Sequence, residues 1–528
     1  MKSTFLTSYR LAITPLSPIH IGCGEDYVPT NYVIDDTRGF LYAFNPGEAY
    51  LAESDLQALR PIATDYKKVT LFYSQHVDVF RPWARRIVPV GAKGLQFYRK
   101  MLAPKGQQKA TEFVIERTAY EVGQSQTEPY VPGSSLKGTV VTALEERLNC
   151  GRRLDSRSDV QGVLGGDFEN SPMRFLRIGD CRGENVLTRV FTSRRFFKND
   201  LKPDGFPLAF EGIMPAQFRV LTGEMTLAAG QNRLRLSHVY DDPADIMHDL
   251  HRYSTARWLE EAGIYKALAP AWYDSVARLF KAMAPRFDSG RAALVRLGKN
   301  AGAQSKTLHG ENLPRILIRH KNSRINPPEV LPETLTLCLT DEAEPVWNGL
   351  PYGWAIIELN PDDEFSALDD WCENIRPDFI RALIGGSISD EWDRILMQKE
   401  ERTQMREIKR QEDEARRLKQ EMEAQEEARK AEALAAMSEE AREITTVCDA
   451  LESWNGNVNP GTTLFNEVKA LLEKAQDWSN AEDKLALAQR IQPLMKKKNM
   501  YQGKAEKLFK AQLRALRGEA WSFLMKKR

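Results

Sequence analysis

The sequence is poor in the features that mark several familiar classes of protein. Its six cysteines are spread over 528 residues, and no two of them form a Cys-x-x-Cys pair. This spacing argues against a zinc ribbon or a disulfide framework, and it favours a reduced, cytoplasmic setting. No apolar run approaches the length of a membrane-spanning helix, and the first residues are too polar for a signal peptide. We therefore expect a soluble protein with no membrane partner.

A net charge of one sign is also missing. The chain carries 74 lysines and arginines against 73 aspartates and glutamates, for a formal charge of +1. Any surface for nucleic acid must then be a local patch on a balanced protein. The stretch GSSLKG at 133–138 fails as a Walker A loop, because its lysine precedes the second glycine. Hydrolysis of ATP or GTP therefore has no support.

Short β-like runs and helical patterns alternate between residues 8 and 361. Strands mixed with a few helices predict an α+β fold made of tandem ferredoxin-like, RRM-like domains, at 1–165 and 166–385. The segment 391–443 contains no glycine or proline, which predicts one long charged helix. A small basic helical module is expected at 456–528. Its lysines either touch an acidic polymer or form a solvated helix face.

The stretch GSSLKG opens a predicted helix, since apolar residues recur at three- and four-residue steps from 136 to 148. A helix N-terminus offers unpaired N–H groups and a positive dipole end, so with Lys137 and two hydroxyls it suits a phosphate. Two interpretations stay open here. One is an anion site, and the other is an ordinary N-cap made by Ser134 or Ser135 beside a solvated lysine.

Three further stretches have the composition of polyanion contacts. RVFTSRRFFKNDLK, from Arg189, mixes basic residues with phenylalanines, which pairs phosphate attraction with base stacking. The alternative is that these phenylalanines belong to the core. VRLGKNAGAQSKTLHG, from Val295, is a glycine-containing loop that would let a phosphate chain approach closely. RILIRHKNSR, from Arg315, adds more positive charge.

The sequence gives less support to catalytic or metal-binding residues than to polyanion contacts. His20 lies in an apolar strand that runs into a Gly-x-Gly turn, and no partner base or acid can be named for it. The helical stretch HDLHRY at 248–253 lacks a second cluster that would complete a metal site. Cys23 has no thiol-protease context. We therefore expect no catalytic set, no metal and no cofactor.

The motifs also occur in an order typical of one family. TPLSPIHIGCGED near the start, YVPGSSLKGTVVTAL, RFLRIGD, FEGIMPAQF, VRLGKNAGAQSKT and LPYGWAIIEL span about residues 8–385. Together they resemble the RAMP superfamily of CRISPR-associated proteins, and most closely the fifth Csm subunit of type III-A effector complexes. The chain departs from the family pattern at Val141, where arginine is usual, at Ala216, where glycine is usual, and at Lys299–Ala301.

The resemblance implies a non-catalytic subunit that binds crRNA without reading its sequence. Such a subunit caps the backbone filament at the crRNA 3′ end and supports crRNA maturation and antiviral interference. Its expected partners are crRNA, backbone RAMP subunits, a small subunit and, at some contacts, target RNA. The alternatives are a metal-independent RAMP endoribonuclease, with His20 as base and Lys137 stabilising charge, and a Cmr-type RAMP subunit. The residues expected to bind RNA are His20, Gly133, Ser134, Ser135, Lys137, Gly138, Arg194, Arg195, Lys198, Arg296, Lys299 and Lys306.

Overall fold

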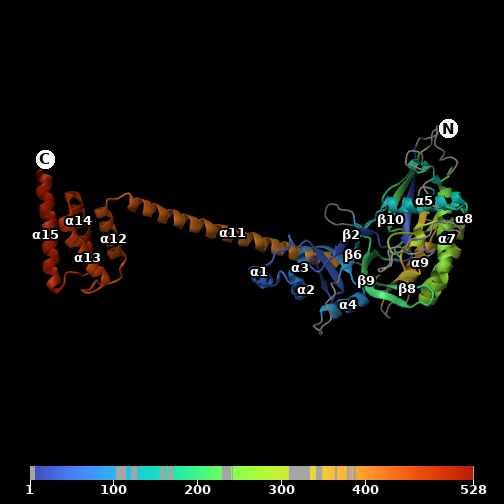
Figure 1. The fold of residues 1–528 in the computed structure, drawn as a ribbon, viewed down its shortest axis with the longest axis horizontal. Helices are drawn as coiled ribbons and strands as arrows, with labels where there is room; N and C mark the ends of the chain where they lie inside the picture. Colours follow the sequence, from blue (N-terminus) through green and yellow to red (C-terminus); the bar gives the residue numbers. More distant parts are fainter. Residues whose placement is uncertain are drawn as a thin grey trace. The chain divides into compact units, whose positions relative to one another are not determined.

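A computed structural model of the chain shows two compact units, Met1–Thr403 and Gln404–Arg528 (Figure 1). The structure describes residues 6–102, 114–120, 128–154, 159, 162–164, 171–228, 240, 242–308, 333–340, 348–362, 365–376, 381, 383 and 388–526. The basic stretch RILIRHKNSR lies outside the described residues. Within them, no helix is long and apolar enough to cross a membrane.

A five-stranded antiparallel sheet forms the centre of the first unit, in the order β11-β14-β1-β10-β7. Along the chain, β1, α5, β7, β10, α7 and β14 follow one another with the strand order of a ferredoxin-like unit, and β11 is an added edge strand. The predicted α+β, ferredoxin-like fold is confirmed. The bounds are β1(Leu6–Pro15), α5(Gly133–Asn149), β7(Leu176–Ile178), β10(Leu221–Ala228), α7(Pro243–Leu268), β11(Ala292–Arg296) and β14(Trp354–Leu359).

One hydrophobic core joins this sheet to its two helices. Leu11 and Ile13 of β1 point to the same face because side chains alternate along a strand. They pack with Leu136 and Val140 of α5 and with Leu250 of α7, and all five residues are almost fully buried. The apolar spacing in the sequence of α5 therefore lies against the sheet. This packing holds the first turns of α5 against the sheet.

A six-stranded sheet in the order β13-β12-β8-β9-β6-β2 and a three-stranded meander, β3-β4-β5, complete the strands of the first unit. Both larger sheets combine strands from either side of residue 165. The domain limits 1–165 and 166–385 stay a prediction.

The strand bounds are β2(Gly22–Tyr27), β3(Tyr32–Asp35), β4(Phe40–Phe44), β5(Ala84–Pro89), β6(Ile115–Thr118), β8(Thr188–Phe197), β9(Pro203–Ile213), β12(Thr334–Leu339) and β13(Leu350–Pro351). The other α-helices that the structure describes in this unit are α1(Glu53–Leu59), α2(Tyr66–Gln75), α3(Val77–Phe80), α4(Ala92–Leu102), α8(Pro270–Asp288) and α9(Ala367–Ile375).

The predicted long charged helix is confirmed as α11(Ile388–Ala435). It ends eight residues earlier than the predicted 443, since Ser438 starts a new helix by accepting a hydrogen bond from the Ala441 amide at 3.1 Å. The helices that follow share a core that includes Cys448, Val468 and Phe509. They are α12(Glu439–Ser453), α13(Thr463–Lys474), α14(Ala481–Lys497) and α15(Gly503–Lys526).

The first turns of α11 belong to the core of the first unit. The buried Glu391 carboxylate accepts hydrogen bonds from Arg38 Nη1 at 2.9 Å and from the Tyr42 hydroxyl at 3.1 Å. Ile395, one turn further on, is 1% exposed. We predict that the fragment ending at residue 403 melts cooperatively at the temperature of the first unit in the full chain. A fragment ending at residue 387 should melt several degrees lower, because Arg38 and Tyr42 lose their partner. Thermal melts of both fragments by circular dichroism test this, and equal melting temperatures would contradict it.

Candidate functional site

Three segments that lie far apart in the sequence meet at a pocket of about 430 Å³. They are the first turns of α5, the glycine loop at 296–306, and residues 21–22 where β2 begins. The pocket brings together six of the residues that the sequence predicts as RNA contacts. These are Ser134, Ser135, Gly138, Arg296, Lys299 and Lys306.

Three hydroxyl residues of this pocket were missed by the sequence reasoning. Thr139 and Thr142 follow Ser135 and Gly138 at helical spacing on α5, so they share a face with them. Extending the GSSLKG motif by one helical turn would have found both residues. Ser305 comes from the glycine loop.

The glycine loop is held against the chain that precedes β2. Gly298 has a φ of +83°, which favours glycine, and a Cβ atom at this position would lie only 2.3 Å from the His20 carbonyl oxygen. The next amide, that of Lys299, donates a hydrogen bond to the same carbonyl oxygen at 2.8 Å. The loop can approach so closely only because residue 298 lacks a side chain.

Arg296 lines the pocket from a buried position, with its side chain 2% exposed. Its Nη1 atom bonds to the Glu261 carboxylate at 2.8 Å, and its Nε atom donates to the Tyr352 carbonyl oxygen at 3.1 Å. Burial alone would raise the pKa of Glu261, but the charges of Arg296 and Lys198 lower it, so this carboxylate is ionised. The Nη2 atom of Arg296 is buried and has no hydrogen-bond partner among the described residues.

Two lysines at the pocket differ in how firmly they are engaged. Lys299 is 52% exposed and its ammonium group forms an ion pair with Glu116. Lys306 is paired with no acid among the described residues, and partial desolvation lowers its pKa. The pocket therefore combines three cationic side chains with five hydroxyl groups. The cationic groups and the serine hydroxyls of α5 suit the phosphate and hydroxyl oxygens of a ribose-phosphate chain. The hydroxyls of Thr139, Thr142 and Ser305 donate to backbone carbonyl oxygens of the protein.

His20 is next to this pocket but does not line it. Its ring is fully buried, its Nδ1 atom is 2.6 Å from the Glu211 carbonyl oxygen, and it packs on Phe210 at a ring distance of 5.3 Å. The Nε2 atom lies 3.7 Å from the Glu116 carboxylate. The carbonyl oxygen of His20 accepts the hydrogen bond from the Lys299 amide and so holds the glycine loop in place. In this conformation the imidazole is out of reach of any ligand in the pocket.

The start of α5 contradicts one of the two interpretations of GSSLKG, the serine N-cap. The N-cap is Pro132, which has no capping side chain, so the predicted Ser134 or Ser135 cap is wrong. The reason is a close crossing, since a Cβ atom on Gly133 would lie 2.1 Å from the Ile178 carbonyl oxygen. The Gly133 amide donates to the Asp180 carboxylate at 2.8 Å. A protein carboxylate therefore takes the first free amide, and the serine hydroxyls remain at the pocket.

Lys137 is directed away from the pocket. Its ammonium group donates a hydrogen bond to the Leu176 carbonyl oxygen at 2.8 Å, and burial, followed by the nearby charge of Arg177, lowers its pKa. We predict that Lys137→Met leaves RNA affinity within about twofold of the unaltered protein and costs about 1 kcal/mol of stability, from one lost charge-assisted hydrogen bond. Urea unfolding and RNA-binding titrations measure the two effects. A large loss of RNA affinity with unchanged stability would instead place the ammonium group at the RNA.

The hairpin of β8 and β9 holds the other predicted contacts. Arg194 Nε donates to the Gly205 carbonyl oxygen at 3.1 Å, and Arg195 pairs with Asp204 at 3.0 Å. Lys198 instead bonds at 2.7 Å to Glu261, the carboxylate that also bonds to Arg296. Of the phenylalanines, Phe191 is 2% exposed and Phe196 packs against the core. The core alternative is therefore correct for these two rings.

An exposed aromatic ring does occur on the same hairpin, in the neighbouring strand. Phe206 of β9 is 90% exposed, and Leu208, two residues on, is 52% exposed. Both lie on the strand that pairs with the arginine-bearing part of β8. The sequence signal was an apolar residue at alternate positions in GFPLAF, next to a glycine and a proline. Sequence reasoning missed it.

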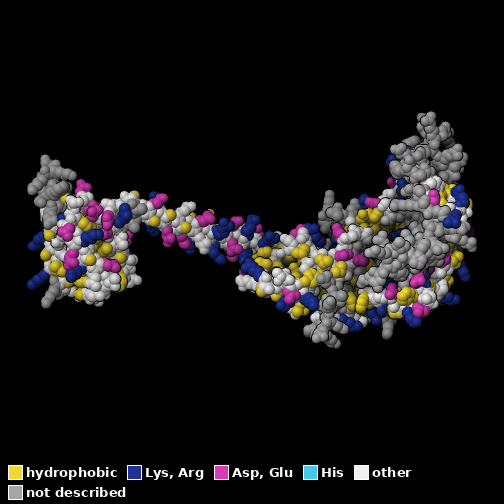
Figure 2. Space-filling model, in the orientation of Figure 1, with side chains coloured by type: hydrophobic (Ala, Val, Ile, Leu, Met, Phe, Trp, Pro, Cys, Tyr) yellow, Lys and Arg dark blue, Asp and Glu magenta, His cyan; other side chains and the backbone are white. Residues whose placement is uncertain are grey.

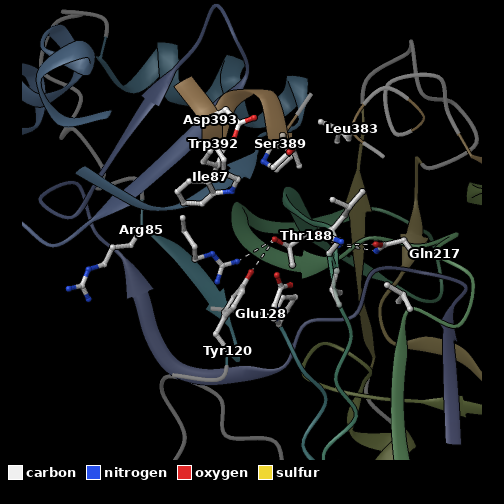
Figure 3. Close-up of a pocket in the computed structure, with 18 of the residues that line it drawn as sticks. Arg85, Ile87, Tyr120, Glu128, Thr188, Gln217, Leu383, Ser389, Trp392 and Asp393 are labelled. Atoms are coloured by element: carbon white, nitrogen blue, oxygen red, sulfur yellow. Dashed lines mark hydrogen bonds between the residues drawn. The ribbon is translucent and has the colours of Figure 1, made fainter. Parts of the chain in front are cut away.

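A second, larger cavity of about 650 Å³ lies where the meander meets the first turns of α11 (Figure 3). Ile87, Tyr120 and Thr188 face Ser389 and Trp392 across it. Its three arginines are paired with protein carboxylates and its lining includes two acidic residues, Glu128 and Asp393, so it is less suited to an anion than the smaller pocket. These pairs are Arg85 with Glu48, Arg86 with Glu211, and Arg376 with Glu373.

The described residues contain no cluster of three or more histidine, cysteine, aspartate or glutamate side chains that could hold a metal ion. The two histidines of HDLHRY have structural contacts. His248 Nε2 lies 3.1 Å from the Asp288 carbonyl oxygen, and His251 Nδ1 accepts a hydrogen bond from the Leu294 amide at 3.2 Å. Burial also lowers the pKa of His251 to about 4, so its ring is neutral at physiological pH.

Comparisons with known proteins point to one superfamily. Residues 12–217 match the family model of the RAMP superfamily. No curated protein sequence matches the chain closely enough to count as a relative. Among solved structures, a chain of a Csm–crRNA–target RNA ternary complex from a type III-A CRISPR-Cas system shares 16% identity, with a TM-score of 0.42. The match covers 67% of this chain and 100% of that one. Csm5 from T. onnurineus shares 14% identity, with a TM-score of 0.39, covering 66% of this chain and 99% of that one.

Proposed function

Because residues 12–217 match the family model of the RAMP superfamily, we propose that this protein is a non-catalytic RNA-binding subunit of a type III-A CRISPR effector complex of the Csm kind. In this proposal it caps the backbone filament at the crRNA 3′ end. The observation that carries the proposal is the pocket in which the start of α5 and the glycine loop converge on the buried Arg296.

The chemistry of this pocket fits an RNA backbone better than an RNA base. Arginine, lysine and hydroxyl donors bind phosphate and ribose oxygens, and such contacts position a strand without reading its sequence. Among the described residues, the lining includes no aromatic side chain on which a base could stack. A subunit that holds many different guides needs this kind of contact.

The β8–β9 hairpin would add a stacking contact. We predict that Phe206→Ala weakens binding of single-stranded RNA by about 5- to 150-fold, the range expected when one stacked base is lost. Leu259→Ala is the matched control, because Leu259 is also strongly exposed, at 67%, but lies on α7. Fluorescence anisotropy with labelled RNA measures both. Equal affinities for the two variants would remove Phe206 from the RNA surface.

The position of His20 supports a non-catalytic role. A general base must reach the proton that it abstracts, and this ring is fully buried with Nδ1 beside a carbonyl oxygen. The test is to incubate the full chain with repeat-containing RNA in EDTA. We expect bound, intact RNA. Cleavage at one defined position, lost in His20→Gln, would support the endoribonuclease alternative and overturn this proposal.

A Cmr-type subunit remains the second alternative. Affinity purification of the tagged protein from its own cells separates the two, by the identity of the backbone and large subunits that accompany it. We expect a Csm-type set together with crRNA. A Cmr-type set would reassign the complex but keep the RNA-binding role.

A further inference from the structure

Helix α11 carries a line of uncharged side chains through a highly charged sequence. In the segment 404–425, taken as a heptad repeat, none of the seven a and d positions is charged, whereas twelve of the other fifteen positions are. A solvated helix without a partner has no need for such a line. We call these seven residues the seam: Gln404, Ile408, Gln411, Ala415, Leu418, Met422 and Gln425.

The seam is uncovered in the described part of the chain. Its large apolar side chains are strongly exposed, Ile408 by 57%, Leu418 by 62% and Met422 by 65%. Met405, which flanks the seam, is 68% exposed. Figure 2 shows hydrophobic side chains between charged ones along this helix. Exposed apolar groups at this spacing mark a helix–helix contact surface.

The charges beside the seam indicate what kind of helix fits it. The positions that flank the seam within 404–425 carry four acidic residues and one lysine, Lys419. The acidic ones are Glu407, Glu412, Glu414 and Glu421. The outer face carries two acidic residues, Asp413 and Glu423, and five basic ones: Arg406, Lys409, Arg410, Arg416 and Arg417. Flanking charges set partner choice in paired helices, so the favoured partner has lysine or arginine beside its own apolar line.

A second copy of this chain fits poorly. In a parallel pair, Glu407 would face Glu412 of the other copy and Glu421 would face its Glu426, and these two like-charge contacts outnumber the one favourable contact, Glu414 with Lys419. An antiparallel pair would place the row of Glu407, Glu414 and Glu421 against the same row of the other copy. Like charges at these positions oppose pairing.

We propose that the seam of α11 docks an amphipathic helix with basic flanks from another protein chain. The occupant inserts its apolar side chains beside Ile408, Leu418 and Met422, and its lysines or arginines pair with the acidic rows. The three glutamines in the seam weaken the apolar contact and make recognition depend on these charges. The surface would give this protein a partner that the RNA pocket does not provide.

The test uses the full chain and two synthetic four-heptad helical peptides. Both carry isoleucine at a and leucine at d, but one has lysine and the other glutamate at e and g. We expect the lysine peptide to bind at least about tenfold more tightly than the glutamate peptide, and the difference to shrink at high salt. Hydrogen exchange should slow at 404–425 on binding. No binding of the lysine peptide, or equal binding of both peptides, would overturn the proposal.

Matched variants locate the contact on the helix. Leu418→Lys with Met422→Lys places two charges in the seam, whereas Gln420→Lys with Ala424→Lys places the same two charges on the outer face. All four positions are exposed, so folding is not at risk. We expect the first pair to lower affinity at least about tenfold and the second pair to leave it within about twofold. An equal loss in both, or a dimer of the unaltered chain that the seam variant dissociates, would overturn the proposed heteromeric helix contact.

Discussion

Replacing Lys299 and Lys306 together by methionine is expected to weaken binding of single-stranded RNA by about tenfold to a hundredfold at physiological salt. Methionine keeps much of the apolar stem and removes the charge. If each lysine neutralises one phosphate, the slope of log affinity against log salt should fall by about 1.4. Titrations at several salt concentrations measure affinity and slope in one experiment.

The matched control for this variant is Lys266→Met with Lys281→Met. Both lysines are exposed, and they lie on α7 and α8, away from the residues that line the pocket. The control removes the same charge and should change the affinity by less than about threefold. If both double variants lose the same affinity and the same slope, RNA is held by general charge and not by the pocket.

Glu211→Ala is expected to lower the free energy of unfolding by about 3–5 kcal/mol, the cost of leaving a buried charge without its partner. The Glu211 carboxylate is fully buried and pairs with Arg86. It also accepts hydrogen bonds from the hydroxyls of Thr188 at 2.7 Å and Tyr27 at 3.0 Å. Removing it leaves these donors unsatisfied in the middle of the six-stranded sheet.

The control is Glu48→Ala, which breaks an exposed arginine pair on the same unit. Glu48 is 47% exposed in its pair with Arg85, and such surface pairs contribute about 0–1 kcal/mol. Urea unfolding of the two variants, followed by tryptophan fluorescence, compares them. A loss of less than about 1 kcal/mol for both would show that Glu211 is not the organising group of this sheet.

Local patterns in the sequence predicted the elements that depend on neighbours along the chain. The helix after GSSLKG follows from the spacing of Leu136, Val140 and Leu144, which all face the core. The long charged helix follows from the absence of glycine and proline over 391–443. Its end at Ala435 depends on the Ser438 cap, a signal that is present in the sequence but was not read.

Contacts between distant segments could not be read in this way. The residues around Gly133 do not indicate that the Asp180 carboxylate accepts a hydrogen bond from its amide. The residues around His20 do not indicate that its carbonyl oxygen bonds to the glycine loop. The arginine–phenylalanine mixture from Arg189 was compatible with stacking or with core packing. Strand alternation and the pairing of β8 with β9 and β12 decide it, and the pairing with β12 joins residues more than a hundred positions apart. The convergence of the motifs, and not any one motif, identifies the pocket.

Photocrosslinking of the full chain to RNA that contains 4-thiouridine, with the crosslinked peptides identified by mass spectrometry, tests the central claim most directly. If the start of α5 and the glycine loop hold the ribose-phosphate chain, crosslinks should concentrate in peptides that include 134–142 and 298–306. Crosslinks confined to the basic residues of α14 and α15, with none at either of these segments, would contradict the account.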